Sequence, residues 1–315
     1  MKRSHLLLFL KGLAMGAANV VPGVSGGTIA YITGIFEELI ESIKRFNLDA
    51  LKLLFQFKIK QLWEHVNGTF LLVLFAGVGV SIVSLAKLFK FLLEHPDPSY
   101  GMWLMAFFFG LILVSIFQVG STIQQWNAGT ITALIIGLAI AVGIALVRPA
   151  SENDAFWYVF LSGAIAICSM ILPGLSGSFV LILLGNYKLI MLDAISSFDF
   201  RIILPFAIGA IIGLAGFAYI LSWIIKHYRE ITIALMTGFI AGSLSIIWPW
   251  KHAVYMLDAA GNPLMRKGKP IVEGYEWYMP GLGETSTWVG VGMIVIGALL
   301  VWGLDRWGKK MGGSI

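Results

Sequence analysis

Charged residues are scarce in this sequence: they make up 12% of its 315 residues, about half of the roughly 25% that is typical of soluble domains. So few charges leave too little polar surface to cover a soluble particle of this size. Apolar residues make up 58% of the chain, and the mean hydropathy is +0.86. The composition therefore predicts an integral membrane protein.

Cysteine and histidine are also rare, and this excludes some chemistry. The single cysteine, Cys168, excludes an internal disulfide. The five histidines lie near the ends of apolar tracts or in loops, and the sequence contains no zinc-type cluster and no P-loop. We therefore expect no cofactor, no metal and no enzymatic activity. The net charge of +5 comes from Lys and Arg between apolar tracts, where they set membrane topology rather than bind nucleic acid.

Long charge-free tracts fill the space between the few charges. A membrane-spanning helix needs about 20 mostly apolar residues, and several tracts reach that length. We predict six spanning helices, at residues 69–93, 101–118, 131–147, 202–225, 231–249 and 288–304.

The chain contains an internal repeat. Residues 21–27 (VPGVSGG) recur 151 residues later as residues 172–178 (LPGLSGS). The same offset aligns Gly12 with Gly163 and Gly34 with Gly185. We therefore expect two related halves, residues 1–150 and 151–315.

Each Pro-Gly motif interrupts an apolar tract. Proline removes a backbone donor and disfavours helix at the residue before it. The tract 155–187 is long for one crossing and short for two. We predict re-entrant hairpins at residues 5–44, with helices near 5–21 and 24–44, and at residues 156–195. A kinked pair of ordinary crossings is the alternative.

The predicted elements define an all-α polytopic membrane protein. In each half, the hairpin returns to the side where it entered and three helices cross the membrane. Because three is odd, the halves would have inverted topology, as in many secondary transporters. Lys and Arg flank the first hairpin and follow the last helix. The positive-inside rule therefore places both termini in the cytoplasm and loop 250–287 outside. Residues 48–63 read as an amphipathic segment on the inner leaflet.

The repeated motif is typical of an anion site. Helix N-termini carry partial positive charge and bind phosphate, and glycines let a ligand approach the backbone. Two such turns entering from opposite faces would meet near the midplane. The alternative is that small residues only permit close helix packing. The candidate phosphate-binding residues are Gly23, Ser25, Gly26, Gly27, Thr28, Gly174, Ser176, Gly177 and Ser178.

Four further residues are candidates for accessory roles. Glu37 follows Thr28 by nine residues, roughly 14 Å along a continuous helix, and could couple transport to protons. It could also be an ordinary interfacial acid. Arg148 and Arg201 could gather anionic headgroups or anchor the interface. Asn19 precedes the first turn and could hydrogen-bond to it or serve helix packing.

The first motif also matches the G-x-S-x-G pattern of hydrolases. A serine nucleophile needs a base within hydrogen-bond reach. No apolar tract contains a histidine, which disfavours an intramembrane hydrolase.

The run from Lys11 to Thr28, followed by Gly34 to Glu37, resembles a family of bacterial polytopic membrane proteins, the PopT-type polyprenyl-phosphate (undecaprenyl-phosphate) translocases. Residues 172–178 resemble that family's second motif. The resemblance implies a translocase of the bacterial cytoplasmic membrane that returns undecaprenyl phosphate from the outer to the inner leaflet. A transporter or channel for a small soluble anion is the alternative.

Overall fold

A computed structural model describes most of the chain. It covers residues 3–20, 24–93, 95, 97–147, 149–255, 262, 265–266, 269–270, 272–281 and 283–310. Most of these residues are helical.

The first half contains eight helices among its described residues. They are α1 (Arg3–Val20), α2 (Gly26–Ile32), α3 (Phe36–Lys44), α4 (Leu48–Phe55), α5 (Ile59–His65), α6 (Gly68–Leu93), α7 (Ser99–Gly120) and α8 (Ala128–Leu146). The second half consists of α9 (Phe156–Ile171), α10 (Gly177–Leu183), the π-helix η1 (Lys188–Ala194), α11 (Ile195–Ser197), α12 (Phe200–His227), α13 (Arg229–Ser243), the strands β1 (Lys251–Tyr255), β2 (Met265–Arg266), β3 (Lys269–Pro270) and β4 (Val272–Trp277), and α14 (Thr285–Lys310).

In the described part of the chain, five helices are long and apolar enough to span a membrane: α6, α7, α8, α12 and α14. They confirm five of the six predicted crossings as apolar helices. The sixth, predicted at 231–249, is shorter than expected, because α13 ends at Ser243. Backbone bonds from Ser245 and Ile246 back to residues 242 and 243 turn the chain there, just before Pro249.

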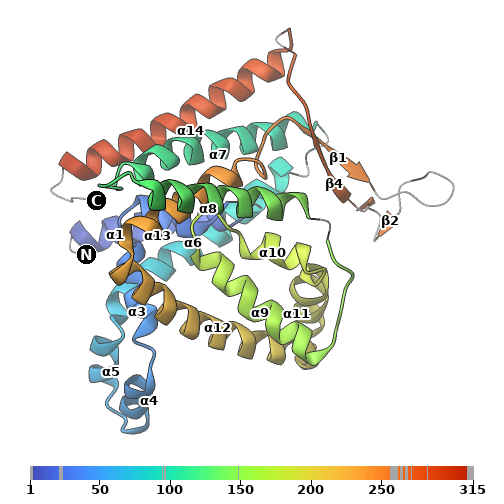
Figure 1. The fold of residues 1–315 in the computed structure, drawn as a ribbon. Coiled ribbons are helices and arrows are strands. Elements are labelled where there is room, and N and C mark those ends of the chain that lie inside the picture. Colours follow the sequence, from blue (N-terminus) through green and yellow to red (C-terminus); the bar gives the residue numbers. More distant parts are fainter. Residues whose placement is uncertain are drawn as a thin grey trace.

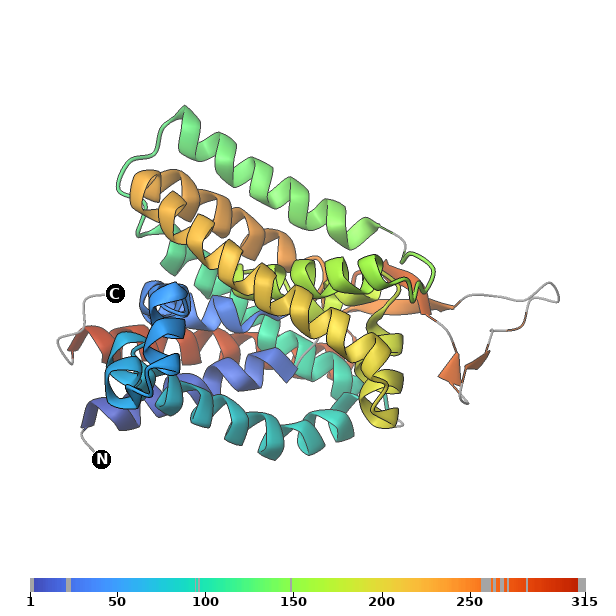
Figure 2. The same cartoon turned by 90° about the horizontal axis from the view of Figure 1, so that it is seen from below.

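The long helices run back and forth between the two ends of the molecule. Figures 1 and 2 show that α1 begins and α14 ends at the same end, while β1 and β4 lie at the opposite end. Helices α6, α8 and α13 run away from the end where α1 begins, and α7, α12 and α14 run back towards it. Corresponding helices of the two halves therefore run in opposite directions.

Equivalent helix pairs pack in the same way in both halves. Helix α1 packs on α6, and α9 packs on α12. A Cβ atom at Gly12 would collide with the carbonyl oxygen of Leu74, and one at Gly163 would collide with that of Phe206. Glycine at these two matched positions therefore lets each hairpin helix approach the backbone of its neighbour.

The second arm of each hairpin is broken, where the sequence predicted one helix over 24–44. In the first hairpin Gly34 interrupts this arm with φ +71°, and in the second hairpin Gly185 interrupts it with φ +75°. This left-handed conformation ends a helix and favours glycine. The prediction of a continuous helix over 24–44 was wrong because Gly34 stops it, and Gly185 has the same conformation in the second hairpin.

The surface elements differ from a purely helical plan. The strands β1 and β4 form an antiparallel hairpin within the predicted external loop, a local addition to a chain that is mostly helical. Helices α4 and α5 lie at the end where α1 begins. Large apolar side chains of these helices and of the turn between them are exposed, including Phe55, Phe57 and Trp63, as expected of an amphipathic segment.

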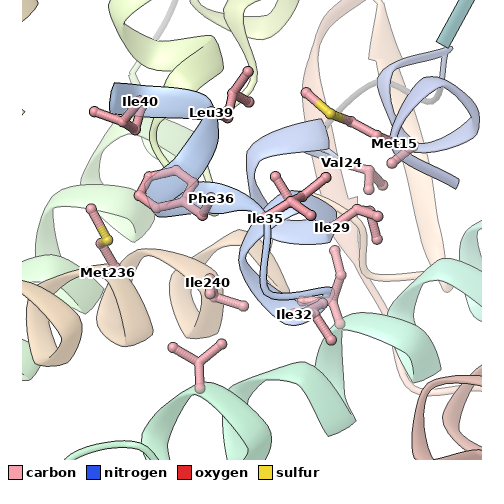
Figure 3. Close-up of a cluster of buried hydrophobic side chains, with 14 of the residues drawn as sticks. Met15, Val24, Ile29, Ile32, Ile35, Phe36, Leu39, Ile40, Met236 and Ile240 are labelled. Carbon is pink, nitrogen blue, oxygen red and sulfur yellow. The ribbon is translucent and has the colours of Figure 1, made fainter. Parts of the chain in front are cut away.

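The main hydrophobic core surrounds the first broken hairpin. Figure 3 shows Phe36 of this hairpin beside Met236 and Ile240 of α13, and Met15 and Ile29 belong to the same cluster on its far side. The core therefore joins the first half to a helix of the second half, and it fixes the position of the first motif relative to the second.

Candidate functional site

The two Pro-Gly-x-Ser-Gly turns, which the sequence predicted to meet, bond directly to each other. The Ser25 hydroxyl donates to the carbonyl oxygen of Leu172 at 3.2 Å. The Gly174 N–H donates to the Thr28 hydroxyl at 2.9 Å. A Cβ at Gly27 would collide with the Ile171 carbonyl oxygen, so only glycine permits this approach. Ser25 and Thr28 are buried.

Three backbone donors of the first turn, those of Gly26, Gly27 and Thr28, are satisfied within the protein. The Gly26 N–H donates to the side-chain oxygen of Asn19 at 2.8 Å, and the Gly27 N–H donates to the Ser25 hydroxyl at 3.1 Å. The Thr28 N–H donates to the Ser25 carbonyl. Asn19 therefore makes the hydrogen bond to the turn that the sequence suggested. A ligand at this turn must replace internal partners.

The second turn has the same backbone but fewer internal bonds. Ser176 has φ −111° and ψ 123°, close to φ −108° and ψ 127° at Ser25. The Ser176 side chain makes no capping hydrogen bond. Its hydroxyl lies 3.0 Å from the hydroxyl of Ser178, which is partly exposed. The paired hydroxyls of Ser176 and Ser178 therefore retain hydrogen-bonding capacity that Ser25 has already used.

The hydroxyls of Ser25 and Ser176 have no catalytic base among their hydrogen-bond partners in the described residues. Ser25 bonds to backbone groups and Ser176 to another hydroxyl. His227 bonds to the Trp223 carbonyl and His65 to Asn47. In the described structure, neither serine is therefore arranged as a nucleophile with its base.

Glu37 lies on α3, beyond the break at Gly34. Its carboxylate forms an ion pair with Arg229 at 2.9 Å, and both side chains are about half exposed, at 52% and 55%. The break in the helix changes the expected geometry, because Glu37 is no longer on a straight continuation of α2. Its partner Arg229 stands at the start of α13, in the other half of the chain.

The remaining predicted residues are peripheral or lie outside the described part of the chain. Arg201 is exposed near the start of α12. Gly23 and Arg148 lie outside the described residues.

Lys11 of α1 is a partly buried lysine that bonds to the end of α2, a role that was not predicted from the sequence. Its ammonium donates to the Thr33 carbonyl at 2.6 Å, at the end of α2. At the matched place in the second half, the Tyr158 hydroxyl donates to the Leu184 carbonyl at 2.9 Å. Cations at helix C-termini are stabilising. The signal was a lone lysine within an otherwise apolar helix.

Known proteins resemble this chain over most of its length. Residues 15–263 match the model of the VCA0040-like family, described as undecaprenyl phosphate translocase-like. A polyprenyl-phosphate transporter of Vibrio cholerae is 42% identical over 312 residues, covering 98% of each chain. A polyprenyl-phosphate transporter of Staphylococcus aureus is 30% identical over 268 residues, covering 79% of this chain and 88% of the relative. No solved structure matches.

The matched turns, the broken hairpins and the apolar helices are thus those of a multi-pass membrane protein with relatives that carry polyprenyl phosphates. The chain belongs to the undecaprenyl phosphate translocase-like family.

Proposed function

We propose that this protein moves undecaprenyl phosphate, or a related polyprenyl phosphate, from the outer to the inner leaflet of the bacterial cytoplasmic membrane. The observation that carries the proposal is the direct contact between the two turns, through Ser25 and Leu172 and through Thr28 and Gly174. Each contact is a pair of polar groups that can exchange partners with a phosphate. Translocation breaks no covalent bond, and so it needs no nucleophile.

In this proposal the two halves are inverted repeats, each with a re-entrant hairpin. The opposite directions of corresponding helices support it, as do the matched glycine contacts of Gly12 and Gly163. Broken helices that meet between such repeats are the usual site of substrate binding in secondary transporters. The phosphate then stops between the turns while its prenyl tail remains in lipid.

The two turns bind the phosphate one after the other. Ser176, Gly177 and Ser178, with their spare hydrogen-bonding capacity, receive the phosphate first. Ser25 and Thr28 then exchange their bonds across the turns for bonds to phosphate oxygens. The remaining proposed contacts are Gly23, Gly26, Gly27 and Gly174, with Asn19 holding the first turn and Arg148 and Arg201 attracting the headgroup.

An apolar pocket favours a lipid over a small soluble anion. It has a volume of about 280 Å³ and lies between α7, the segment after α13 and β4, where Phe109, Leu244, Ser245, Trp248 and Trp277 line it. Four of these five side chains are apolar or aromatic, which suits an isoprenoid chain rather than a hydrated ion.

The test is transport by the purified protein in liposomes. A polyprenyl phosphate added to the outer leaflet should become protected from an impermeant phosphatase faster with the protein than without it. Inorganic phosphate trapped inside the same liposomes should not leak out. Protein-dependent release of inorganic phosphate without movement of the lipid would instead indicate a soluble-anion transporter.

We further propose that Glu37 couples transport to protons. Its ion pair with Arg229 joins the two halves at 2.9 Å, so protonation of the carboxylate would release α3 from α13. Glu37→Gln should remove the response of transport to a pH gradient while phosphate binding survives. Transport that keeps its pH response in this variant would show that Glu37 is only an interfacial residue.

A further inference from the structure

A second set of phosphate-type donors lies away from the turns, at the end where α1 begins. Ser222 of α12 donates its hydroxyl to one carboxylate oxygen of Glu41, on α3. The Lys226 ammonium lies 3.0 Å from the same oxygen, and the Lys44 ammonium lies 3.9 Å from it. Lys44 also donates to the Ser222 hydroxyl at 3.1 Å. Two ammonium groups and a hydroxyl therefore converge on one anionic oxygen.

Most of these groups are sheltered from solvent. Ser222 is 2% exposed, and the side chains of Lys44 and Glu41 are 23% and 35% exposed, whereas that of Lys226 is 58% exposed and reaches in from the surface. The Lys44 ammonium also stands over the ring of Tyr219, 4.9 Å from its centre. The bond from Ser222, followed by that from Lys226, lowers the pKa of the Glu41 carboxyl, and so Glu41 is an anion near neutral pH.

A phosphate monoester suits these donors better than the carboxylate does. It carries about −1.5 to −2 charges at neutral pH and three acceptor oxygens, against one charge for Glu41. Two lysines and a hydroxyl can each reach a different phosphate oxygen, whereas here all three crowd on a single carboxylate oxygen.

The site also joins the two halves of the chain. Helix α3 follows α2 after the break at Gly34 and packs on α12 of the other half. The corresponding elements of the described chain, η1 and α6, show no comparable packing on each other. Among the described residues, the bonds of Glu41 therefore tie the two halves together at the end where α1 begins and α14 ends.

We propose that Lys44, Ser222 and Lys226 form a release site for the phosphate monoester of the lipid headgroup, and that Glu41 occupies this site as a substitute anion. The arriving phosphate displaces Glu41, which frees α3 from α12 and opens the path out of the turns. Glu41 then displaces the phosphate in turn. This inference rests on the proposed translocation of a lipid phosphate and adds its second binding site.

Binding to the full-length protein in nanodiscs tests the site, with a short-chain polyprenyl monophosphate and with inorganic phosphate as probes. Glu41→Gln removes the competing charge, so the affinity for the lipid probe should rise about tenfold, or about 1.4 kcal/mol. Adding Lys226→Gln to that variant should cancel the gain. Glu38→Gln is the matched control, because Glu38 is on the same helix but bonds to Asn67. It should leave the affinity unchanged.

Three outcomes would overturn the site: no gain in Glu41→Gln, an equal gain in Glu38→Gln, or a gain for inorganic phosphate alone. Should Glu41→Gln not yield a monodisperse protein, Lys226→Gln by itself must lower lipid affinity several-fold, and unchanged affinity would overturn the proposal. Lipid transport by the unmodified protein is measured in parallel. Its absence would reject the translocase function, whereas transport with unaltered binding in the variants would reject only the release site.

Discussion

Ser25 and Ser176 stand at matched positions but have different partners. Ser25 caps α2 and bonds to Leu172, whereas Ser176 bonds only to the hydroxyl of Ser178 among the described contacts. The equivalence that the repeat implies therefore holds for the backbone and not for the side chains. Substitution at the two positions should separate structural from binding roles.

Ser25→Ala should lower stability by about 1 kcal/mol, the usual value of a helix N-cap, and transport should fall with it. Ser176→Ala should leave the unfolding temperature nearly unchanged and reduce transport several-fold, because one hydrogen bond to phosphate is lost. Thermal unfolding in detergent and lipid transport in liposomes measure the two effects. Covalent labelling of either serine by a fluorophosphonate would contradict a binding role.

Lys251 gives the stability a dependence on pH. Burial lowers the pKa of its ammonium from 10.5 to about 8, although it donates to the Ile246 carbonyl and stands 4.5 Å from the centre of the Tyr275 ring. Between these pH values the unfolded chain binds more protons than the folded protein, so stability rises with pH. From pH 8 to 10 the unfolding temperature should rise relative to that of Lys251→Met. If the unfolding temperatures of the two proteins changed equally with pH, Lys251 would not be desolvated.

At the scale of elements, the breaks at Gly34 and Gly185 share a backbone conformation but not a neighbourhood. A Cβ at Gly34 meets nothing within 4 Å, whereas one at Gly185 would collide with the carbonyl oxygens of Ala150 and Ser151. Both glycines have positive φ, which costs other residues roughly 1–2 kcal/mol. The additional collision acts at Gly185 alone.

Gly34→Ala should therefore destabilise the protein by roughly 1–2 kcal/mol, and Gly185→Ala should destabilise it by clearly more. Unfolding temperatures of the two variants in the same detergent provide the comparison. Equal decreases in unfolding temperature would mean that residues 150 and 151 move aside with no loss of stability.

Some elements were predictable from sequence, and others depend on contacts that sequence spacing does not reveal. The apolar tracts predicted six spanning helices, of which five are confirmed, and the repeat predicted the matched turns. The bond from Gly174 to Thr28 arises only when the halves pack together. The break at Gly34 had a local signal, since its repeat partner Gly185 is also glycine, but continuous apolar sequence outweighed it. The pairing of Glu41 with Lys226 joins residues of different halves, beyond the reach of helix periodicity.

At the scale of the whole molecule, the two ends of the helix bundle carry different elements. Helices α4 and α5 lie at one end and the hairpin of β1 and β4 lies at the other. With the first end in the cytoplasm, as the Lys and Arg distribution predicts, the strands face the outside.

Cysteine labelling tests this orientation in a Cys168→Ser background, since Cys168 is the only cysteine of the chain. An impermeant maleimide added to intact cells should label Asn262→Cys and fail to label Lys58→Cys. Both positions are exposed, so burial does not account for a difference. Labelling of position 58 alone would reverse the proposed topology.

The bonds between the two turns also bear on the energy supply of a cell. A column of water through a membrane conducts protons and would dissipate the proton-motive force. The Ser25 hydroxyl bonds to the Leu172 carbonyl, and the Gly174 N–H bonds to the Thr28 hydroxyl. These buried polar groups are bonded within the protein and so need no water. A file of water would therefore find no open hydrogen-bonding partner at these bonded groups, and protons would have no path through them. A membrane rich in this carrier would keep its ion gradients while the carrier is idle.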